Sequence, residues 1–446
     1  MKQILIISKY FAPLNGIASI RWSKIVKYLA NKTDYHITVV TWALKSEDVK
    51  DGILEKEYET IGRRVDLIYI EHIYDTVSTR FVNAYHDKLK KNNSYENHKM
   101  IAYMPYKSAS VKNKIKMNLK YSRYLSHENR FASLAYNKLI GMGYKPDIVI
   151  SSYGDFGDHI LALKLKKRFP YIHLIADYRD PAIRYFFPPR INRFAKKMVL
   201  EVATSSDYII GVTKECIDKH PYPNKNVIIP NGFDRSDNIG LENVSSNNDG
   251  KFHICLTGTV YTGRRDHFHV LFDALNQLTK EGKIDINDFV FEYAGRFSWY
   301  VSDIVKKLKV DDIVVDHGYV KREEALRIQH NSQILMVLSC NNEGESGVLT
   351  GKFLEYMMSG KEILALISGN KSRSIIKEIV EEGSLGFCYE ECTHDLDFKR
   401  LCDFILDCYN EFKSKGYLES KSKKEVIDRY DYQNIAKEVD NLIKQL

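Results

Sequence analysis

The sequence has few long apolar runs, few cysteines and little proline, and the first two shortages exclude whole classes of protein. Its longest apolar stretches, ILIIS at 4–8 and ILMVL at 334–338, are far shorter than the roughly 20 residues that a helix needs to cross a bilayer. The seven cysteines all lie after residue 215, in an odd number and without regular spacing. We therefore expect reduced thiols, with neither a disulfide framework nor a metal site. The first residues lack the pattern of a secretory signal, which predicts a cytoplasmic protein.

The chain is long enough for two domains and carries a moderate excess of positive charge. With 446 residues, of which 44% are hydrophobic, it exceeds one ordinary core. Lys and Arg number 66 against 58 Asp and Glu, a net charge of +8 that suits an anionic partner. Eleven basic residues but only three acidic ones lie between 86 and 130. We call this stretch the basic insert.

Strand-sized apolar runs alternate with helical stretches, which predicts parallel sheets covered by helices and the α/β class. In the first half the expected strands are Gln3–Ser8, His36–Thr41, Asp66–Ile70, Asp147–Ser151, His173–Ala176, Asp207–Val212 and Asn226–Pro230. In the second half they are Phe252–Leu256, Phe289–Tyr293, Ile313–Val315, Ile334–Leu338, Ile363–Ile367 and Gly386–Tyr389.

A polar, asparagine-rich stretch near residue 240 separates the two halves and predicts an interdomain linker. We expect a first domain at 1–234, the linker at 235–250 and a second domain at 251–423. Residues 424–446 have the pattern of an amphipathic helix, which we expect to pack back on the first domain. Two Rossmann-like domains of this kind would face each other across a cleft, with ligands beyond the carboxyl ends of the strands.

The most informative segment is ESGVLTGKFLEYMMSG at 345–360. Thr350 can cap a helix whose first turn holds Gly351 and Lys352, where free amides, the helix dipole and an ammonium together suit a phosphate. Glu355 would lie on the same face and could accept hydrogen bonds from a ribose diol. The alternative is an ordinary exposed Lys–Glu pair on a helix surface, worth a few tenths of a kcal/mol.

Three further strand ends carry small residues that suit an anion or a flat base. LTGTVYTGRRD at 256–266 brings glycines to a turn followed by two arginines, whose guanidinium groups bind phosphate oxygens. YAGRF at 293–297 and HGYVKREE at 317–324 offer backbone groups and a tyrosine for the edge and face of a base. Solvated surface turns are the alternative. The candidate residues are Gly258, Thr259, Arg264, Arg265, Gly295, Gly318 and Tyr319.

In the first domain, KYFAPLNGIASIRW at 9–22 places Gly16 in the loop between the first strand and the first helix. The G-x-G-x-x-G fingerprint is absent, which disfavours a nicotinamide dehydrogenase. Asp177, Arg179 and Asp180 follow a strand, where two carboxylates and a guanidinium could position a reacting sugar. A structural salt bridge is the alternative reading of these three residues.

Taken in order along the chain, these segments resemble the retaining glycosyltransferases of the GT-B fold, in particular the large family 4 group that builds bacterial capsule, lipopolysaccharide and other envelope glycans. The resemblance covers nearly the whole length. Its motifs are ILIISKYFAPLNGIASIRW, IADYRDP, IIPNGFD, TGTVYTGRRD, GYVKREEAL and TGKFLEYMMSG.

The resemblance implies a transferase whose second domain binds a nucleotide sugar, with a UDP-sugar favoured, and whose first domain binds a glycan or lipid-linked acceptor. It places the diphosphate near Arg264, Arg265 and Lys352, and the ribose on Glu355. Gly318 and Tyr319 would lie near the base. Such enzymes normally use no metal cofactor, and retention is ascribed to a front-face mechanism that requires no protein nucleophile.

The resemblance also brings Gly16 toward the donor and places the segment of Asp177 where many relatives carry an active-site histidine. One position departs from the family pattern. Relatives commonly have two glutamates eight positions apart, and counting back from Glu355 gives Gly347. This departure keeps two alternatives open, a catalytically weak partner subunit and a sugar-nucleotide epimerase of the same fold.

The basic insert interleaves tyrosines and aliphatic residues with its lysines. This pattern suits a protein that lies on an anionic membrane, at the inner face of the cytoplasmic membrane, where it would reach a lipid-linked acceptor. An ordinary solvated helix pair is the alternative. The insert contains no recognised nucleic-acid-binding module, so no nucleic-acid partner is expected.

Overall fold

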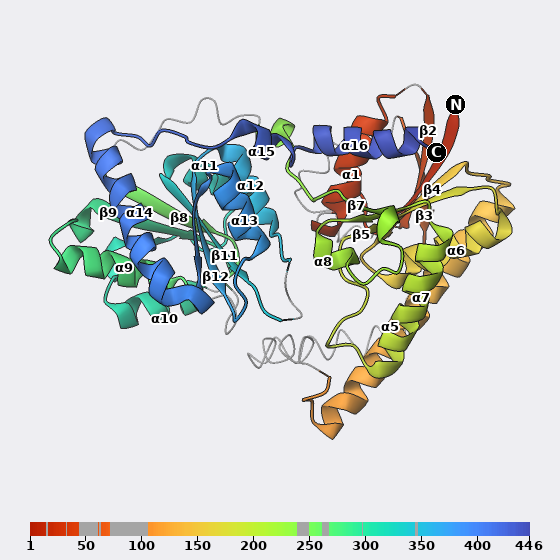
Figure 1. Cartoon of the computed structure of the whole chain (residues 1–446), viewed down its shortest axis with the longest axis horizontal. Helices are drawn as coiled ribbons and strands as arrows, with labels where there is room; N and C mark the ends of the chain where they lie inside the picture. Colours follow the sequence, from red (N-terminus) through yellow and green to blue (C-terminus); the bar gives the residue numbers. More distant parts are fainter. Residues whose placement is uncertain are drawn as a thin grey trace. The chain divides into compact units, whose positions relative to one another are not determined.

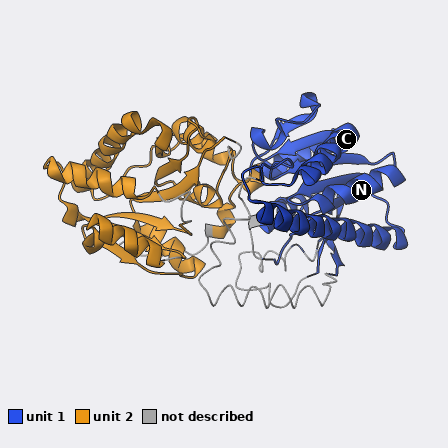
Figure 2. Ribbon diagram, turned by 90° about the horizontal axis from the view of Figure 1, so that it is seen from below, with its two compact units in different colours: residues 1–230, 435–446 blue, residues 231–434 orange. Residues whose placement is uncertain are grey.

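The chain folds into two compact units. The computed structural model describes residues 1–14, 17–32, 34–43, 61, 64–71, 106–238, 249–260, 267–296, 298–343 and 347–446. Unit 1 consists of residues 1–230 and 435–446, and unit 2 consists of residues 231–434 (Figure 2). Each unit contains a parallel sheet covered by helices, which confirms the predicted α/β class (Figure 1).

The sheet of unit 1 has seven parallel strands in the order β3-β2-β1-β4-β5-β6-β7 within the part of the chain described. Strand order reverses between β1 and β4, as in doubly wound folds. The strands are β1 (Lys2–Ile7), β2 (Tyr35–Trp42), β3 (Asp66–Ile70), β4 (Ile148–Tyr153), β5 (His173–Tyr178), β6 (Tyr208–Gly211) and β7 (Asn226–Ile228).

The longer helices of unit 1 bury apolar side chains in its core. Phe131, Ala135 and Leu139 of one helix, for example, are fully buried in a cluster with Leu5 and Val149 of the strands. The helices are α1 (Ile17–Leu29), α5 (Val111–Gly141), α6 (Phe156–Arg168), α7 (Pro189–Ser205), the short α8 (Lys214–Ile217) and η1 (Pro223–Lys225).

Unit 2 repeats the plan, and its described residues form six parallel strands in the order β10-β9-β8-β11-β12-β13. The order reverses between β8 and β11. The strands are β8 (Phe252–Thr257), β9 (Phe289–Ala294), β10 (Val314–Asp316), β11 (Ile334–Cys340), β12 (Glu362–Ser368) and β13 (Gly386–Glu390). All thirteen strands predicted from the sequence are present, with ends that shift by one or two residues.

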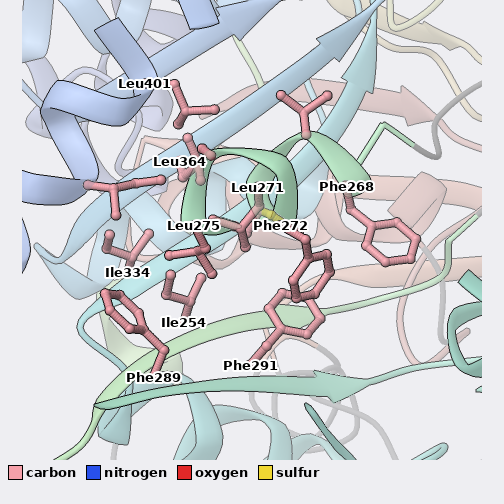
Figure 3. Close-up of a cluster of buried hydrophobic side chains, with 14 of the residues drawn as sticks. Ile254, Phe268, Leu271, Phe272, Leu275, Phe289, Phe291, Ile334, Leu364 and Leu401 are labelled. Carbon is pink, nitrogen blue, oxygen red and sulfur yellow. The ribbon is translucent and has the colours of Figure 1, made fainter. Parts of the chain in front are cut away.

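An aromatic and aliphatic core joins the sheet of unit 2 to its helices (Figure 3). Phe291 of β9 lies 5.2 Å, between ring centroids, from Phe272 of the helix above it. The helices are η2 (Arg235–Asn238), α9 (His269–Lys280), η4 (Ile286–Asp288), α10 (Ser298–Leu308), η5 (Asp311–Ile313), α11 (Arg322–Asn331), α12 (Gly351–Ser359), α13 (Ile375–Gly383), η6 (Glu391–Thr393), α14 (His394–Lys415) and α15 (Lys424–Asp428).

The boundary between the units lies earlier than expected, between Pro230 and Asn231. The described parts of the expected linker, 235–238 and 249–250, belong to unit 2. Arg235 explains this assignment, because its guanidinium pairs at 2.6 Å with both Asp428 and Asp431 of the same unit. These ion pairs anchor residues 235–238, the described start of the stretch that the composition alone presented as a free linker.

The terminal segment is two helices rather than the single helix expected at 424–446. Helix α15 ends at Asp428, and α16 runs from Tyr432 to Lys444. Residues 424–434 belong to unit 2, and residues 435–446 belong to unit 1 (Figure 2). The chain turns at 429–431 because the Phe233 amide donates to the Tyr430 carbonyl, and the Phe233 carbonyl accepts from the Tyr432 amide, both at 2.9 Å.

The basic insert is not a separate element in its described part, residues 106–130. Its last twenty residues form the first two-thirds of α5, a 31-residue helix that continues into the core of unit 1. Met117 and Tyr121 are buried, and the Tyr121 ring lies 5.0 Å from the ring of Phe187. Residues 86–105 of the insert lie outside the described residues.

Candidate functional site

The strand order of unit 2 creates the position at which open parallel sheets bind their ligands. Neighbouring crossover connections diverge where the order reverses between β8 and β11, beyond the carboxyl ends of these strands. Thr257 ends β8 and Gly258 follows it, while Asn341 follows β11.

The strand-end glycines of unit 2 come together, as the positions of their strands in one sheet require. The Gly258 amide donates to the Ala294 carbonyl at 2.8 Å, and the Gly295 amide donates to the Gly318 carbonyl at 2.8 Å. A Cβ on Gly295 would lie 1.8 Å from the carbonyl oxygen of Gly258. The three loops therefore form one layer of backbone, and Gly295 permits their close approach. Thr259 follows in this layer and is half-buried.

Tyr319 projects from the last of these loops. Its side chain is 75% exposed, and the Arg296 guanidinium lies 5.3 Å from the ring centroid. Gly318 has a φ of +65°, and its amide donates to the Asp316 carboxylate at 2.9 Å. The turn thus holds an aromatic face in the open beside the glycine layer, as a base-binding platform requires.

Helix α12 begins where the sequence predicts and is capped at both ends. The Thr350 hydroxyl accepts a hydrogen bond from the Phe353 amide at 3.3 Å, and Gly360 ends the helix with a φ of +67°. Gly351 is the first helical residue and is exposed. The positive end of the helix dipole is therefore open to an anion beside Lys352.

Lys352 and Glu355 form an ion pair at 2.8 Å, but the pair is not the exposed pair of the alternative reading. The Lys352 side chain is 39% exposed, whereas the Glu355 side chain is only 13% exposed. Burial raises the pKa of Glu355, but the charges of Lys352 and Arg322 outweigh burial and lower it to about 2. Glu355 is thus a half-buried, ionised carboxylate near the middle of α12.

Two donors to Glu355 come from α11, and the sequence analysis did not identify them. Arg322 donates to one carboxylate oxygen at 2.8 Å, and Gln329 donates to the other at 2.7 Å. Gln329 also donates to the Thr257 hydroxyl at 2.8 Å, and that hydroxyl lies 2.9 Å from the Tyr356 hydroxyl. The only signal in the sequence was their place in and just beyond GYVKREEAL, seven positions or about two helical turns apart.

Gly347, which stands where the resemblance led us to expect a glutamate, has a φ of +78°. This left-handed conformation costs a residue with a Cβ about 1 kcal/mol, so the backbone here favours glycine. The difference at this position therefore involves the course of the chain as well as a missing carboxylate. Three predicted residues, Gly16, Arg264 and Arg265, lie outside the described residues.

In unit 1, Asp177 is fully buried at the end of β5 and its oxygens are occupied. Its carboxylate accepts from Arg21 at 2.8 Å, from the Trp22 indole at 2.8 Å and from the Ser152 hydroxyl at 3.2 Å. These contacts match the structural salt bridge that was the alternative for this segment.

Arg179 and Asp180 differ from Asp177 in their surroundings. The Arg179 guanidinium donates through Nη1 to the Ala18 carbonyl, while its Nε and Nη2 are buried without a partner among the described residues. Asp180 is exposed and lies 3.4 Å from Arg184. Of the three predicted residues, these two retain groups that a ligand could reach or satisfy.

The reversal point of the sheet in unit 1 is filled by the protein's own side chains. The Lys9 ammonium, after β1, lies 2.5 Å from Glu128 of α5 and 2.9 Å from Asp155 after β4. The Tyr10 and Tyr124 hydroxyls donate to Asp155 at 3.0 and 2.5 Å. This network joins β1, α5 and the β4–α6 loop. Because it fills the reversal point of unit 1, we place the donor site at the corresponding strand ends of unit 2.

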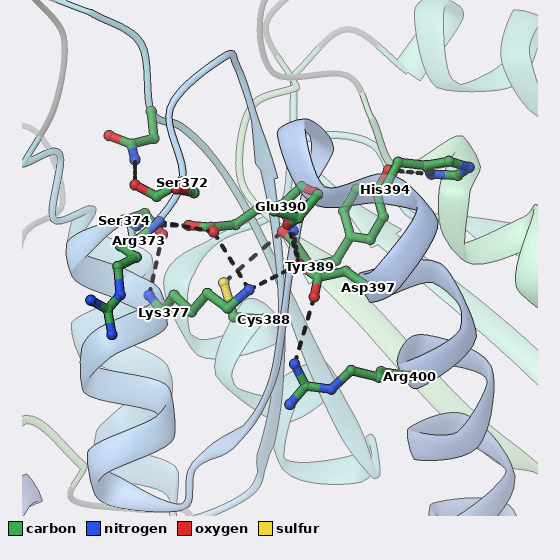
Figure 4. A network of polar contacts seen from close by, with 12 residues as sticks. Ser372, Arg373, Ser374, Lys377, Cys388, Tyr389, Glu390, His394, Asp397 and Arg400 are labelled. Atoms are coloured by element: carbon green, nitrogen blue, oxygen red, sulfur yellow. Dashed lines mark hydrogen bonds and ion pairs between the residues drawn. The ribbon is translucent and has the colours of Figure 1, made fainter.

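A second polar network in unit 2 is structural. Lys377 of α13 lies between Glu390 and Asp397, at 3.5 and 2.9 Å from their carboxylates (Figure 4). Glu390 accepts from the Arg373 and Ser374 amides at 3.0 and 2.7 Å, so a carboxylate already occupies the N-terminus of α13. Both acidic side chains are at most 1% exposed. Helix α13 therefore presents no free anion site.

The described ranges contain neither a metal-binding cluster nor a membrane-spanning helix. No group of three His, Cys, Asp or Glu side chains there could hold a metal ion. None of the helices described is both long and apolar enough to cross a membrane.

Comparison with solved structures identifies the fold as GT-B. Anabaena HepE, solved in complex with UDP and glucose, is 13% identical over 100% of both chains, with a TM-score of 0.58. The lipopolysaccharide outer core galactosyltransferase WaaB is also 13% identical over both full chains, with a TM-score of 0.56. A Listeria monocytogenes protein assigned as a UDP-N-acetylglucosamine 2-epimerase is 12% identical over all of this chain and 96% of its own, with a TM-score of 0.53. No family model and no curated protein matches the sequence.

Proposed function

We propose that this chain is a glycosyltransferase that moves a sugar from a nucleotide-sugar donor to a glycan or lipid-linked acceptor in cell-envelope polysaccharide synthesis. The observation that carries the proposal is the juxtaposition, on one helix, of Lys352 at an exposed N-terminus and of Glu355 as a half-buried, ionised carboxylate. Nucleoside diphosphates present a dianion and a diol a few ångströms apart. A cation and a carboxylate acceptor within one helical turn complement these two groups.

In this proposal unit 2 binds the donor. Lys352 and the first amides of α12 contact the diphosphate, together with Arg264 and Arg265, which stay a prediction from the sequence. Glu355 accepts hydrogen bonds from the ribose, and Tyr319 packs against the base beside Gly318. The complexes of HepE with UDP and with UDP-glucose support a uridine donor.

We further propose that transfer proceeds with retention and without a metal. The bond between the anomeric carbon and the leaving diphosphate breaks, and the acceptor oxygen bonds to that carbon on the same face. The acceptor's proton passes to a leaving phosphate oxygen. The helix dipole of α12 and the ammonium of Lys352 would stabilise the negative charge that develops on the diphosphate.

The acceptor belongs to unit 1 in this proposal, with Arg179 and Asp180 as its contacts and Asp177 holding their segment in place. Gly16 stays a predicted donor contact from this unit. The unpartnered Nε and Nη2 of Arg179 support a polar ligand at this strand end, because buried donors without partners cost about 1–3 kcal/mol each.

An exposed stripe on α5 supports contact with an anionic membrane at the cytoplasmic face. Val111, Ile115 and Leu119 recur every four residues along one side of the helix and are 76%, 57% and 58% exposed. Residues 106–127 contain six basic side chains and no acidic one. Apolar residues at the headgroup level and about 1 kcal/mol per basic residue would together hold the helix on the surface.

A flotation assay with vesicles tests the membrane contact. Ile115→Glu with Leu119→Glu should abolish binding to phosphatidylglycerol-containing vesicles, and wild-type binding should weaken as salt rises. Leu396→Glu in α14, which alters a leucine that is 63% exposed, is the control and should bind as wild type does. Equal binding by the α5 variant and by wild type would refute this part of the proposal.

The experiment for the transferase itself measures the release of nucleoside diphosphate from UDP-, GDP-, ADP- and dTDP-sugars. In this assay water takes the place of the unidentified acceptor, so that slow hydrolysis of the nucleotide sugar releases the diphosphate. One donor should release its diphosphate, and Lys352→Ala should abolish release while Lys306→Ala, an exposed lysine on α10, leaves it unchanged.

Two other outcomes would favour the alternatives. Conversion of the sugar without release of the diphosphate would identify an epimerase. The similarity to the Listeria epimerase structure supports this alternative. Neither release nor binding of any donor would favour a partner subunit, the reading that Gly347 supports. Either result would contradict the transferase proposal.

A further inference from the structure

The ion pair between Lys352 and Glu355 poses a conflict for the proposed donor site. The Lys352 ammonium donates to Glu355 at 2.8 Å, and a diphosphate bound at the N-terminus of α12 would compete with this carboxylate for its three N–H donors. The Lys352 side chain is 39% exposed and carries its ammonium on a flexible stem. Of the two side chains in the ion pair, Lys352 is therefore the one that can move. Glu355, with 13% exposure, would then lose one of its two cations inside the protein.

Helix α11 supplies the donors that would remain. The Arg322 guanidinium donates to Oε2 of Glu355 at 2.8 Å, and the Gln329 amide donates to Oε1 at 2.7 Å. Gln329 is only 3% exposed and is held by its second hydrogen bond, to Thr257 at the end of β8. The carboxylate is therefore oriented from a different helix than the one that carries Lys352.

We propose that Arg322 and Gln329 are positioning residues that hold Glu355 charged and oriented for the ribose diol while Lys352 moves from Glu355 to the donor diphosphate. The inference rests on the proposed function and adds to it the residues that make the exchange possible. A carboxylate offers about four acceptor positions, and three donors occupy Glu355 in this structure. Departure of Lys352 frees a position on Oε1, where a hydroxyl of the diol can donate.

The charges around Glu355 agree with this division of roles. The cations that face it are Lys352 from its own helix and Arg322 from α11, and these offset the burial that would otherwise raise its pKa. On β8, the thiol of Cys255, which interacts with the charge of Lys352, stays neutral because burial raises its pKa to about 12. With Lys352 engaged by a phosphate, Arg322 is the remaining positive charge that keeps the carboxylate ionised.

The test compares the binding of UDP and of 2′,3′-dideoxy-UDP by calorimetry at pH 7. Wild type should bind the dideoxy nucleotide about tenfold or more weakly, because its ribose lacks the diol that Glu355 would accept from. In Arg322→Gln this ratio should fall toward one, and Arg322→Lys should restore part of it. Lys352→Met should weaken both nucleotides but keep the ratio, because α11 still holds the carboxylate.

The matched control is Arg327→Gln on the same helix, which removes an exposed arginine that pairs with Glu324. Its ratio should equal that of wild type. If Arg322→Gln does not fold, as judged by circular dichroism, Gln329→Met removes the other donor and should lower the ratio by itself.

The inference and the proposed function fail by different results. A folded Arg322→Gln that keeps the full discrimination between the two nucleotides would overturn the inference. If Arg322→Gln does not fold, a Gln329→Met variant with the wild-type affinity ratio would overturn it instead. If wild-type protein binds none of UDP, GDP, ADP and dTDP, the proposed function is wrong and the inference falls with it.

Discussion

Arg21 and Asp177 form a two-pronged ion pair in the interior of unit 1. Nη2 and Nε of the arginine lie 2.8 and 3.1 Å from the two carboxylate oxygens, and neither side chain is more than 1% exposed. Arg21 also donates to the Pro230 and Ile229 carbonyls at 2.7 and 3.0 Å. The pair therefore joins α1, the end of β5 and the last residues before the chain leaves unit 1.

We expect Asp177→Asn to destabilise unit 1 by ~3 kcal/mol or more, because it leaves the Arg21 charge buried without its counter-ion. Urea denaturation followed by circular dichroism would measure the loss. Asp180→Asn, three residues on and exposed, is the control and should leave the unfolding midpoint in place. If Asp177→Asn folds as stably as wild type and only activity is lost, Asp177 is a catalytic residue as the resemblance implies.

Two buried histidines predict a loss of stability in acid. Burial, with a contribution from the charge of His220, lowers the pKa of His159 to about 3, and burial lowers the pKa of His220 to about 4. In the unfolded chain both would titrate near 6.5. The unfolded state therefore binds more protons below that pH, and stability falls as pH falls from about 6.5 toward 4.

The size of this effect is about 2–3 kcal/mol per histidine by pH 4.5. The measurement is the free energy of unfolding at pH 7.5 and at 4.5 for wild type, His159→Gln and His220→Gln. Each variant should lose less on acidification than wild type. Asp158 acts in the opposite direction, since burial raises the pKa of its carboxyl and favours the folded state at low pH. A pH dependence that both variants share with wild type would contradict the assignment.

Gly295→Ala should disrupt the glycine layer of unit 2. Its new methyl group would lie 1.8 Å from the Gly258 carbonyl oxygen, and that backbone oxygen cannot move without disturbing the end of β8. We expect a loss of about 2–3 kcal/mol in stability and the loss of nucleotide binding. Gly141→Ala, at the end of α5 with nothing within 4 Å of its Cβ, should instead stabilise or leave stability unchanged. Wild-type affinity for UDP in Gly295→Ala would show that the layer is not part of the donor site.

Val439→Asp should unfold unit 1 preferentially, although residue 439 lies near the end of the chain. Val439 is fully buried in unit 1. Its helix is bonded to β1, where the Lys2 ammonium donates to the Ile443 carbonyl at 3.2 Å, and to β2, where the Tyr35 hydroxyl donates to Asp440 at 2.6 Å. An unpaired buried carboxylate costs several kcal/mol. Limited proteolysis should then cleave unit 1 while unit 2 persists. Asn441→Asp, on the exposed side of the same helix, should resist proteolysis as wild type does.

Much of the fold was predictable because its signals are local. A strand buried on both faces appears as a short apolar run whatever its partners are, so Ile334–Leu338 and Ile363–Ile367 were identified without knowing that they pair. Helix α12 was predictable for a similar reason, since its Thr350 cap and its terminal Gly360 are its nearest neighbours in sequence.

The donors to Glu355 show why part of the site was not predictable. Lys352 is three residues away from Glu355 and was identified with it, but Arg322 and Gln329 are 33 and 26 residues away on another helix. Arg327 and Gln333 stand at similar distances from Glu355 along the sequence, and no local pattern separates them from Arg322 and Gln329. Only the packing of α11 beside β8 selects these two.

The sequence by itself determined the α/β class, the two sheets, the terminal amphipathic segment and the residues at the strand ends, because these depend on apolar periodicity and on caps within a few residues. The tertiary structure decided which charges meet. It placed Asp177 in a saturated ion pair and Glu355 among three donors, and it assigned residues 435–446 to unit 1. These features depend on contacts between distant segments, whose burial and pairing no local pattern records.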